Sequence, residues 1–368
     1  MTTLSTSNFV PPLPISKTCI YKVIGKTSIP IDIYLPSCLP KNGDTHPIML
    51  YIHGGGWLGS NRLDYCRPLF YEFLELGFVV TSMDYRLLPE TSLQGQLSDI
   101  RDVEYWLKDC LGAEIGSSRI DVDIERIVVA GASAGAHLAL LTPKLWVNKP
   151  AAILSLYGPT NLHHLPYQQR GRFSNPCTAI CTSEMLTGAT DYANPPTNTA
   201  IGRVGHPRGI MARQIFEQEI IAEFLIKGLL RQLDGSLQLP EQGSVAKEEI
   251  DAISPIHILE TTSFPPVYQI MGDCDDVFDT LHVKNFHAAL IARSVPAVEI
   301  LVPNVLHAFD IPAEIGSEIH MSFVEPAVKW TAAWVGVGNE LEGTGGDLRE
   351  EVFATSQLAT RPCLTEAS

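Results

Sequence analysis

The hydrophobic positions of the chain fall into short continuous apolar runs, and segments with apolar residues at helical spacing separate them. Runs of this length predict buried strands. The predicted strands cover residues 31–35, 47–52, 78–83, 126–130, 151–157, 266–271 and 297–302. Because these strands alternate with helices, the pattern predicts an α/β fold with a mostly parallel central sheet and helices on both of its faces.

About a hundred residues separate the predicted strands at 151–157 and 266–271. Their first half is polar and rich in proline and glycine, whereas their second half carries apolar residues at helical spacing. We therefore expect a cap at 165–235, inserted into a core of residues 20–164 and 236–337, to cover a pocket at the carboxyl ends of the strands. We expect its apolar residues, Phe224 and Leu225 among them, to influence substrate choice. A helix that pairs two copies into a homodimer is the competing interpretation.

The two ends of the chain differ in composition from this core. Residues 1–19 form an N-terminal segment without the basic start and apolar stretch of a secretory signal, and residues 338–368 are acidic and polar, which predicts a disordered tail. No stretch reaches the roughly 18 apolar residues of a membrane span, so we expect a cytoplasmic protein. The net charge of −15 over 368 residues disfavours binding to nucleic acid or to anionic membranes.

The pentapeptide Gly131-Ala132-Ser133-Ala134-Gly135 follows the apolar run 127–130 and precedes a run of small residues with helical character at 136–141. Strand, sharp turn and helix in this order are typical of a nucleophile elbow, in which the turn lifts a serine hydroxyl above the sheet. A glycine-rich turn without function is the alternative for the pentapeptide taken alone. Ser133 is the predicted nucleophile.

A second glycine-rich segment, His53-Gly54-Gly55-Gly56-Trp57, follows the predicted strand at 47–52. Glycines at this place expose backbone N–H groups, which stabilise the negative oxygen that develops during acyl transfer. We predict that the N–H groups of Gly55, Gly56 and Ala134 form this oxyanion hole.

The acid and the base of such a site follow the serine in the chain, each on a loop after a strand. The acidic loop after the strand at 266–271 offers Asp273, Asp275 and Asp276, and periodicity alone does not choose among them. The loop after the last strand holds His307, the predicted base. This chemistry requires no metal or organic cofactor, and the eight cysteines lack the paired spacing of a zinc site or a disulfide framework.

Several separated segments resemble the hormone-sensitive-lipase type of α/β-hydrolase, an esterase group that grades into arylformamidases. They are Ile31–Pro36, His53–Trp57, Asp84–Glu90, Asp99 with Trp106, Gly131–Leu138 and Ser254-Pro255. The resemblance implies that the catalytic acid is the fourth residue of the Gly-x-x-Asp segment, Asp275. Ala132 stands where the lipase group usually has aspartate, and the ending Ala136-His137 is closer to arylformamidases.

These observations predict a serine hydrolase that cleaves a carboxylic ester, or a related acyl bond, of a small organic substrate through an acyl-enzyme. A hydrolase or thioesterase of a polyketide or terpenoid pathway, and an arylformamidase, are the alternatives, because all three share one acyl-transfer site. A non-catalytic receptor for a small molecule on the same fold is disfavoured by the presence of His307.

Overall fold

The structure of the protein is a computed structural model that describes residues 13–37, 45–116, 120–163, 181–188, 191–199 and 206–337. The predictions for the start of the N-terminal segment, for the beginning of the inserted cap and for the whole tail concern residues 1–12, 164–180 and 338–368. They lie outside the described residues.

A central sheet organises the described part of the chain, where it has eight strands in the order β1-β2-β4-β3-β5-β6-β9-β10. The strands are β1 Lys17–Ile24, β2 Thr27–Tyr34, β3 His46–Ile52, β4 Val79–Met83, β5 Val122–Ala132, β6 Ala152–Leu156, β9 Val267–Gly272 and β10 Ala297–Val302. The strands from β4 to β10 in this order are parallel, whereas β1 pairs antiparallel with β2 and β2 pairs antiparallel with β4. The mostly parallel sheet predicted from the sequence is confirmed.

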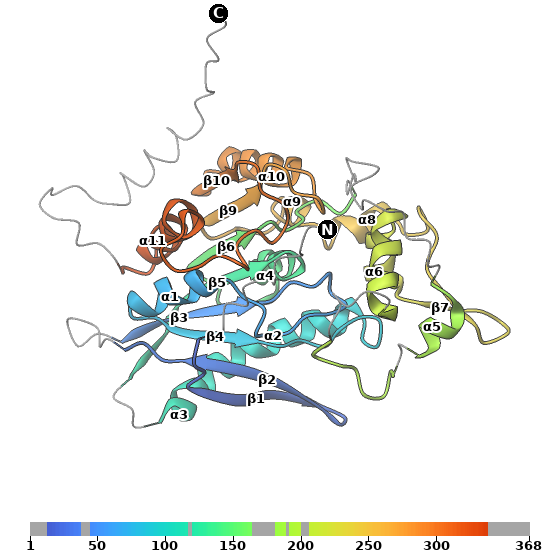
Figure 1. Cartoon of the computed structure of the whole chain (residues 1–368), viewed down its shortest axis with the longest axis horizontal. Coiled ribbons are helices and arrows are strands. Elements are labelled where there is room, and N and C mark those ends of the chain that lie inside the picture. Colours follow the sequence, from blue (N-terminus) through green and yellow to red (C-terminus); the bar gives the residue numbers. More distant parts are fainter. Residues whose placement is uncertain are drawn as a thin grey trace, which may run out of the picture.

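Helices cover both faces of this sheet (Figure 1). Helix α4 (Ala134–Leu145) packs on β5 and β6 and against α2 (Leu93–Asp109), whereas α11 (Glu325–Ala333) packs on β6 and β9 and against α1 (Arg67–Glu75). The remaining helices of the core are α3 Leu111–Ile115, α9 Pro255–Ile258, α10 Leu281–Ala292 and the π-helix η1 His320–Val324.

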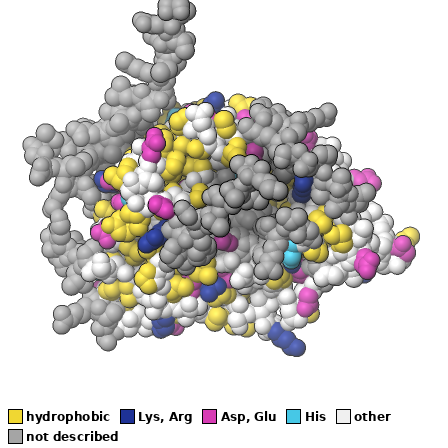
Figure 2. All heavy atoms as spheres, in the orientation of Figure 1, with side chains coloured by type: hydrophobic (Ala, Val, Ile, Leu, Met, Phe, Trp, Pro, Cys, Tyr) yellow, Lys and Arg dark blue, Asp and Glu magenta, His cyan; other side chains and the backbone are white. Residues whose placement is uncertain are grey.

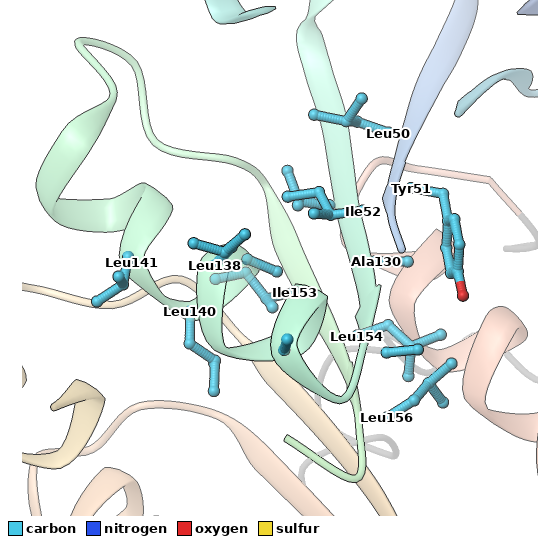
Figure 3. Packing of buried hydrophobic residues seen from close by; sticks show 14 of the residues in the cluster. Leu50, Tyr51, Ile52, Ala130, Leu138, Leu140, Leu141, Ile153, Leu154 and Leu156 are labelled. Carbon is cyan, nitrogen blue, oxygen red and sulfur yellow. The ribbon is translucent and has the colours of Figure 1, made fainter. Parts of the chain in front are cut away.

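The core lies where strand residues meet these helices. Figure 3 shows Leu50 and Ile52 on the side of the sheet where Leu138 of α4 lies, while Tyr51 points to the opposite side. Successive residues of a strand alternate between faces, and each of these four side chains is fully buried. Because both faces are covered, β3 is buried at every position, which explains why its sequence is a continuous apolar run instead of an alternating one.

The edge strand β1 was not predicted. Its buried residues, Cys19 and Tyr21, alternate with exposed ones, a weaker signal than the apolar runs of the central strands. The predicted boundary between residues 19 and 20 lies inside this strand.

Residues between β6 and β9 contribute no strand to the central sheet in the described ranges, and α5, α6, β7 and α8 lie together at one end of it (Figure 1). The elements are α5 Ser183–Gly188, α6 Pro207–Glu217, α7 Ile221–Lys227, β7 Leu230–Arg231, β8 Leu237–Gln238 and α8 Lys247–Asp251. Strands β7 and β8 form a hairpin in which the Gln232 N–H donates to the Ser236 carbonyl over 2.8 Å. The predicted boundary at 235/236 falls in its turn. We call the described residues 181–251 the inserted segment.

Charged side chains on the face seen in Figure 2 are scattered, and lysines and arginines form no large patch on its described part. No helix in the described ranges is long and apolar enough to cross a membrane.

Candidate active site

Ser133 lies in the turn between β5 and α4 with φ 53° and ψ −121°, an unusual backbone conformation for a residue other than glycine. Its N–H donates to the Leu156 carbonyl of the neighbouring strand over 2.8 Å, which fixes the turn to the sheet. The turn also needs close packing, because a Cβ on Gly135 would lie 2.1 Å from the Ile52 carbonyl oxygen. The sequence therefore forms a strand, a tight turn and a helix that expose one serine at the carboxyl end of the sheet.

The structure brings Ser133, Asp275 and His307 together, although they lie far apart in the sequence. The His307 ring is bonded at both nitrogens: Nε2 lies 2.9 Å from Ser133 Oγ and Nδ1 lies 2.8 Å from Asp275 Oδ2. The Asp275 side chain is fully buried, whereas the His307 side chain is 14% exposed. An anionic carboxylate at Nδ1 favours the tautomer with its proton on that nitrogen, which leaves Nε2 as the acceptor for the serine proton.

The three aspartates of the acidic loop have separate partners. Asp275 reaches the ring of His307, and its Oδ1 accepts hydrogen bonds from the Val277 and Phe278 N–H groups at 2.8 and 2.9 Å. Asp276 accepts the backbone N–H of His307 over 3.1 Å, and Asp273 accepts that of Asn304 over 2.7 Å. One carboxylate therefore orients the imidazole, and the other two hold the backbone of the histidine loop.

The glycine loop after β3 lies beside Ser133, since a Cβ on Gly54 would come within 3.1 Å of the Ser133 Cβ. Gly55 has φ +92°, and a Cβ there would lie 2.1 Å from the Gly59 carbonyl oxygen, so only glycine fits this turn. Among the described residues, the N–H groups of Gly55, Gly56 and Ala134 have no hydrogen-bond partner. Ala134 is also the first residue of α4, where the helix dipole favours negative charge.

A buried histidine to which the sequence assigned no role supports this loop. His137 of α4 lies between the indole of Trp57, whose Nε1–H points to Nδ1 at 3.3 Å, and the Ile253 carbonyl, 2.8 Å from Nε2. These partners require a neutral ring with its proton on Nε2, and burial lowers the pKa of His137 to about 4. The histidine after the elbow therefore fixes the indole at the end of the glycine loop.

The segment Asp84–Glu90 holds the opposite side of the glycine loop. The Tyr85 hydroxyl lies 3.1 Å from the carbonyl oxygens of both His53 and Gly54, and its ring stacks on the His53 imidazole with centroids 4.3 Å apart. Burial lowers the pKa of His53 to about 4. Arg86 forms an ion pair with the buried carboxylate of Asp99, 2.7 Å away, which ties this segment to α2. The segment is structural support for the site.

Tyr157 and Asp310 form a second support, which the sequence did not indicate. The Tyr157 ring contacts the His307 ring with centroids 4.6 Å apart, and its hydroxyl donates to Asp310 Oδ1 over 2.7 Å. Burial raises the pKa of the Asp310 carboxyl. The sequence feature that could have indicated this pair is the position of Asp310, three residues after His307.

Helix α6 of the inserted segment comes close to the glycine loop through Phe216. A Cβ on Gly56 would be 3.6 Å from the Phe216 ring, which also packs against Phe278 at 5.9 Å, and Phe278 contacts His307 at 5.6 Å between centroids. Arg208, on the same helix, donates to the carbonyl oxygens of Leu58 and Leu88 and forms a buried ion pair with Glu90.

The expectation that Phe224 and Leu225 influence substrate choice stays a prediction. Both side chains lie on α7 and are buried, at 2% and 1% exposed, so they contribute to the interior of the structure. Leu225 faces a small pocket that the start of α2 and the end of α8 also line. Phe216 is a described residue of the inserted segment that packs beside the glycine loop and Phe278.

Comparisons with known proteins agree with this architecture. The BD-FAE family model matches residues 31–198. The chain is 31% identical over 295 residues to the non-reducing polyketide synthase atr1 of Stereocaulon alpinum, which covers 76% of the chain and 11% of the synthase. It is 29% identical over 327 residues to the synthase Preu6 of Preussia isomera, which covers 85% of the chain and 14% of the synthase. The chain thus spans 11% to 14% of the length of these curated relatives.

Solved structures share the fold at low sequence identity. The thermophilic esterase Est2 of Thermogutta terrifontis with propionate bound has a TM-score of 0.55 at 17% identity, covering 90% of this chain and 97% of the esterase. Esterase B from Lactobacillus rhamnosis has a TM-score of 0.58 at 18% identity and 89% coverage of both chains. The resemblance found in the sequence is confirmed at the level of the fold: the chain has the α/β-hydrolase fold, and the BD-FAE family model matches its residues 31–198.

Proposed function

We propose that the protein is a serine hydrolase that cleaves a carboxylic ester, or a related acyl bond, of a small organic substrate. The observation that carries this proposal is the hydrogen-bonded chain from Ser133 Oγ to His307 Nε2 and from His307 Nδ1 to Asp275 Oδ2, with distances of 2.9 and 2.8 Å. A nucleophile, a base within reach of its proton and a carboxylate that orients the base are the three parts that acyl transfer needs.

Each residue then has one task. His307 Nε2 takes the proton of Ser133 Oγ while that oxygen attacks the carbonyl carbon, and Asp275 stabilises the resulting imidazolium. The N–H groups of Gly55, Gly56 and Ala134 donate to the oxyanion. The imidazolium returns its proton to the leaving group, and an acyl-enzyme on Ser133 remains. Water, activated by His307, attacks the acyl carbon and releases the acid.

A second candidate is hydrolysis of an acyl thioester in a polyketide pathway. It is favoured by the similarity of the chain to parts of polyketide synthases. The same catalytic groups serve esters, thioesters and the N-formyl bond of an arylformamidase substrate, so the candidates differ only in the leaving group.

The test is a comparison of turnover on p-nitrophenyl esters of increasing acyl length, acyl thioesters and N-formylkynurenine. We expect Ser133→Ala to lower kcat about a thousandfold or more on every substrate that the protein hydrolyses, because the members of a triad act as a unit. An organophosphate should label Ser133. Ser263→Ala, an exposed serine that bonds to Lys149, is the matched control and should keep full activity. Activity of Ser133→Ala within a few-fold of the unmodified protein would contradict the proposal.

A further inference from the structure

Three side chains outside the proposed catalytic site point their ligating atoms at one another. His163 follows β6, Asp251 ends α8 and His257 lies on α9. His163 Nε2 is 2.5 Å from Asp251 Oδ1, and His257 Nε2 is 3.4 Å from the same oxygen. The potential ligand atoms of all three lie within 4.8 Å of one another.

Hydrogen bonds on both sides of this cluster hold its two backbone segments together. The Ile256 N–H donates to the Thr160 carbonyl over 3.0 Å, and the Leu162 N–H donates to Ser254 Oγ over 3.0 Å. The Ser254 hydroxyl in turn donates to the Ile250 carbonyl over 2.8 Å. The cluster therefore stands on a preformed scaffold, because its backbone positions are fixed by bonds that do not involve its own side chains.

Two imidazoles and one carboxylate are a donor set that Zn²⁺ binds in proteins. Zinc at about 2.0–2.1 Å from each ligand in a tetrahedron places neighbouring ligand atoms roughly 3.3 Å apart. The separation of 3.4 Å between His257 and Asp251 already matches this edge. The closer contact between His163 and Asp251 would have to widen by less than about 1 Å, a change within reach of side-chain rotation.

A fourth side chain completes the resemblance to a metal centre. The second ring nitrogen of His257, Nδ1, lies 3.1 Å from Glu260 Oε1. Histidines that bind metals almost always donate their other N–H to a carboxylate or carbonyl, which orients the ring and leaves Nε2 for the metal. The side chains of His163, His257 and Asp251 are 18%, 28% and 31% exposed, so an ion from solvent can reach them.

We propose that His163, Asp251 and His257 form a Zn²⁺ site, with water as the fourth ligand and Glu260 orienting His257. His163 lies before the inserted segment and Asp251 ends it, 88 positions further along the chain, so the ion joins the two ends of that segment. An ion that binds only the native state stabilises that state by the free energy of its binding. Acyl transfer at Ser133 does not need this ion.

The experiment uses the full chain, stripped with a chelator and dialysed, to which Zn²⁺ alone is added during calorimetric titration and thermal unfolding. We expect one ion per chain and a Tm that rises with zinc concentration. Co²⁺ in place of zinc should give the intense visible absorption of a tetrahedral site. Mg²⁺ should bind far more weakly, because it prefers oxygen ligands.

Zinc affinities of substituted proteins show which side chains bind the ion. Glu260→Gln should weaken zinc binding about ten- to hundredfold, and His163→Ala, Asp251→Asn and His257→Ala should each weaken it more. Glu248→Gln, an exposed neighbour on α8 with the same change in charge, is the matched control and should bind as the unmodified protein does. Zinc affinity that is absent, or that stays within threefold in the Asp251 and His257 variants, would overturn the proposal and assign any bound zinc to other side chains. Circular dichroism distinguishes lost binding from lost folding, and Glu260→Gln leaves all three ligands in place.

Discussion

The loops that hold Ser133, Asp275 and His307 are fixed to the core in a different way from helix α6 of the inserted segment. Backbone hydrogen bonds to strands hold the loops: the Ser133 N–H donates to the Leu156 carbonyl, and the Asp273 N–H to the Val302 carbonyl over 2.9 Å. Backbone hydrogen bonds also attach the start of the inserted segment to the core, since the Ser60 N–H donates to the Thr199 carbonyl over 2.8 Å. Helix α6 is instead anchored in part by one side chain, Arg208, on carbonyls of the core and on Glu90. The candidate catalytic geometry therefore depends on the sheet, whereas the position of α6 depends in part on side-chain contacts that a single substitution can remove.

The largest effect that this comparison predicts is at the acidic loop. Asp275→Asn should lower kcat about a thousandfold or more, because an amide at Nδ1 of His307 favours the wrong tautomer and does not stabilise the imidazolium. Asp273→Asn and Asp276→Asn should stay within about tenfold, since an amide oxygen can still accept the backbone N–H groups of Asn304 and His307. Steady-state kinetics on one good ester measures all three. A damaging Asp276→Asn beside a mild Asp275→Asn would reverse the proposed roles.

The next effect concerns Arg208, which anchors α6 to the core. Arg208→Ala should lower the free energy of unfolding by about 3–5 kcal/mol, because it leaves the Glu90 carboxylate buried without its cation. Arg213→Ala removes a partly exposed ion pair with Glu217 on the same helix and should cost less than about 1 kcal/mol. Urea unfolding of the two variants provides the comparison. Equal losses of unfolding free energy in the two variants would show that the buried Arg208–Glu90 pair stabilises the fold no more than the exposed Arg213–Glu217 pair does.

The same contrast explains what the sequence could predict. Ser133 and His307 were found because each follows an apolar strand in a local pattern, and the strands themselves bury both faces. Asp275 needed the spacing known from related hydrolases, since three aspartates lie in one short loop. The Arg208–Glu90 pair spans 118 positions, and its formation depends on how the inserted segment folds back. An apolar stripe shows that α7 is buried but not against what, so the influence of Phe224 on substrate choice stays a prediction.

Acid should lower the stability of the protein through two buried histidines beside the sheet, His53 and His137. Burial lowers the pKa of His53 and of His137 to about 4. Below a pH of about 6.5, these two histidines therefore bind protons in the unfolded chain but not in the native protein. Their contribution to stability is complete above that pH and is lost as the pH falls toward 4, by about 1.4 kcal/mol per pH unit for each histidine.

Urea unfolding between pH 7 and pH 5 measures this slope. In His137→Gln, stability at pH 7 should be lower, because the bonds to Trp57 and Ile253 are changed, but its decline with acid should be shallower. A slope identical to that of the unmodified protein would mean that His137 is not the group that resists protonation.

The smallest predicted effect tests whether α6 influences substrate binding without changing the reactivity of Ser133. Phe216 is the residue of α6 that packs beside Gly56 and Phe278, so Phe216→Ala removes an aromatic contact at the site. Such a contact contributes about 0.5–1.5 kcal/mol, which corresponds to a rise in KM of roughly two- to thirteenfold for long or aromatic acyl groups. Labelling of Ser133 by a small organophosphate should keep its rate, because the triad rests on the sheet. Phe73→Ala, buried on α1 of the core, is the control: it should lower stability by about 3–5 kcal/mol and leave KM unchanged. If Phe216→Ala slowed labelling and turnover in parallel while the protein stayed folded, the inserted segment would belong to the catalytic framework, and the separation between the two regions would fail.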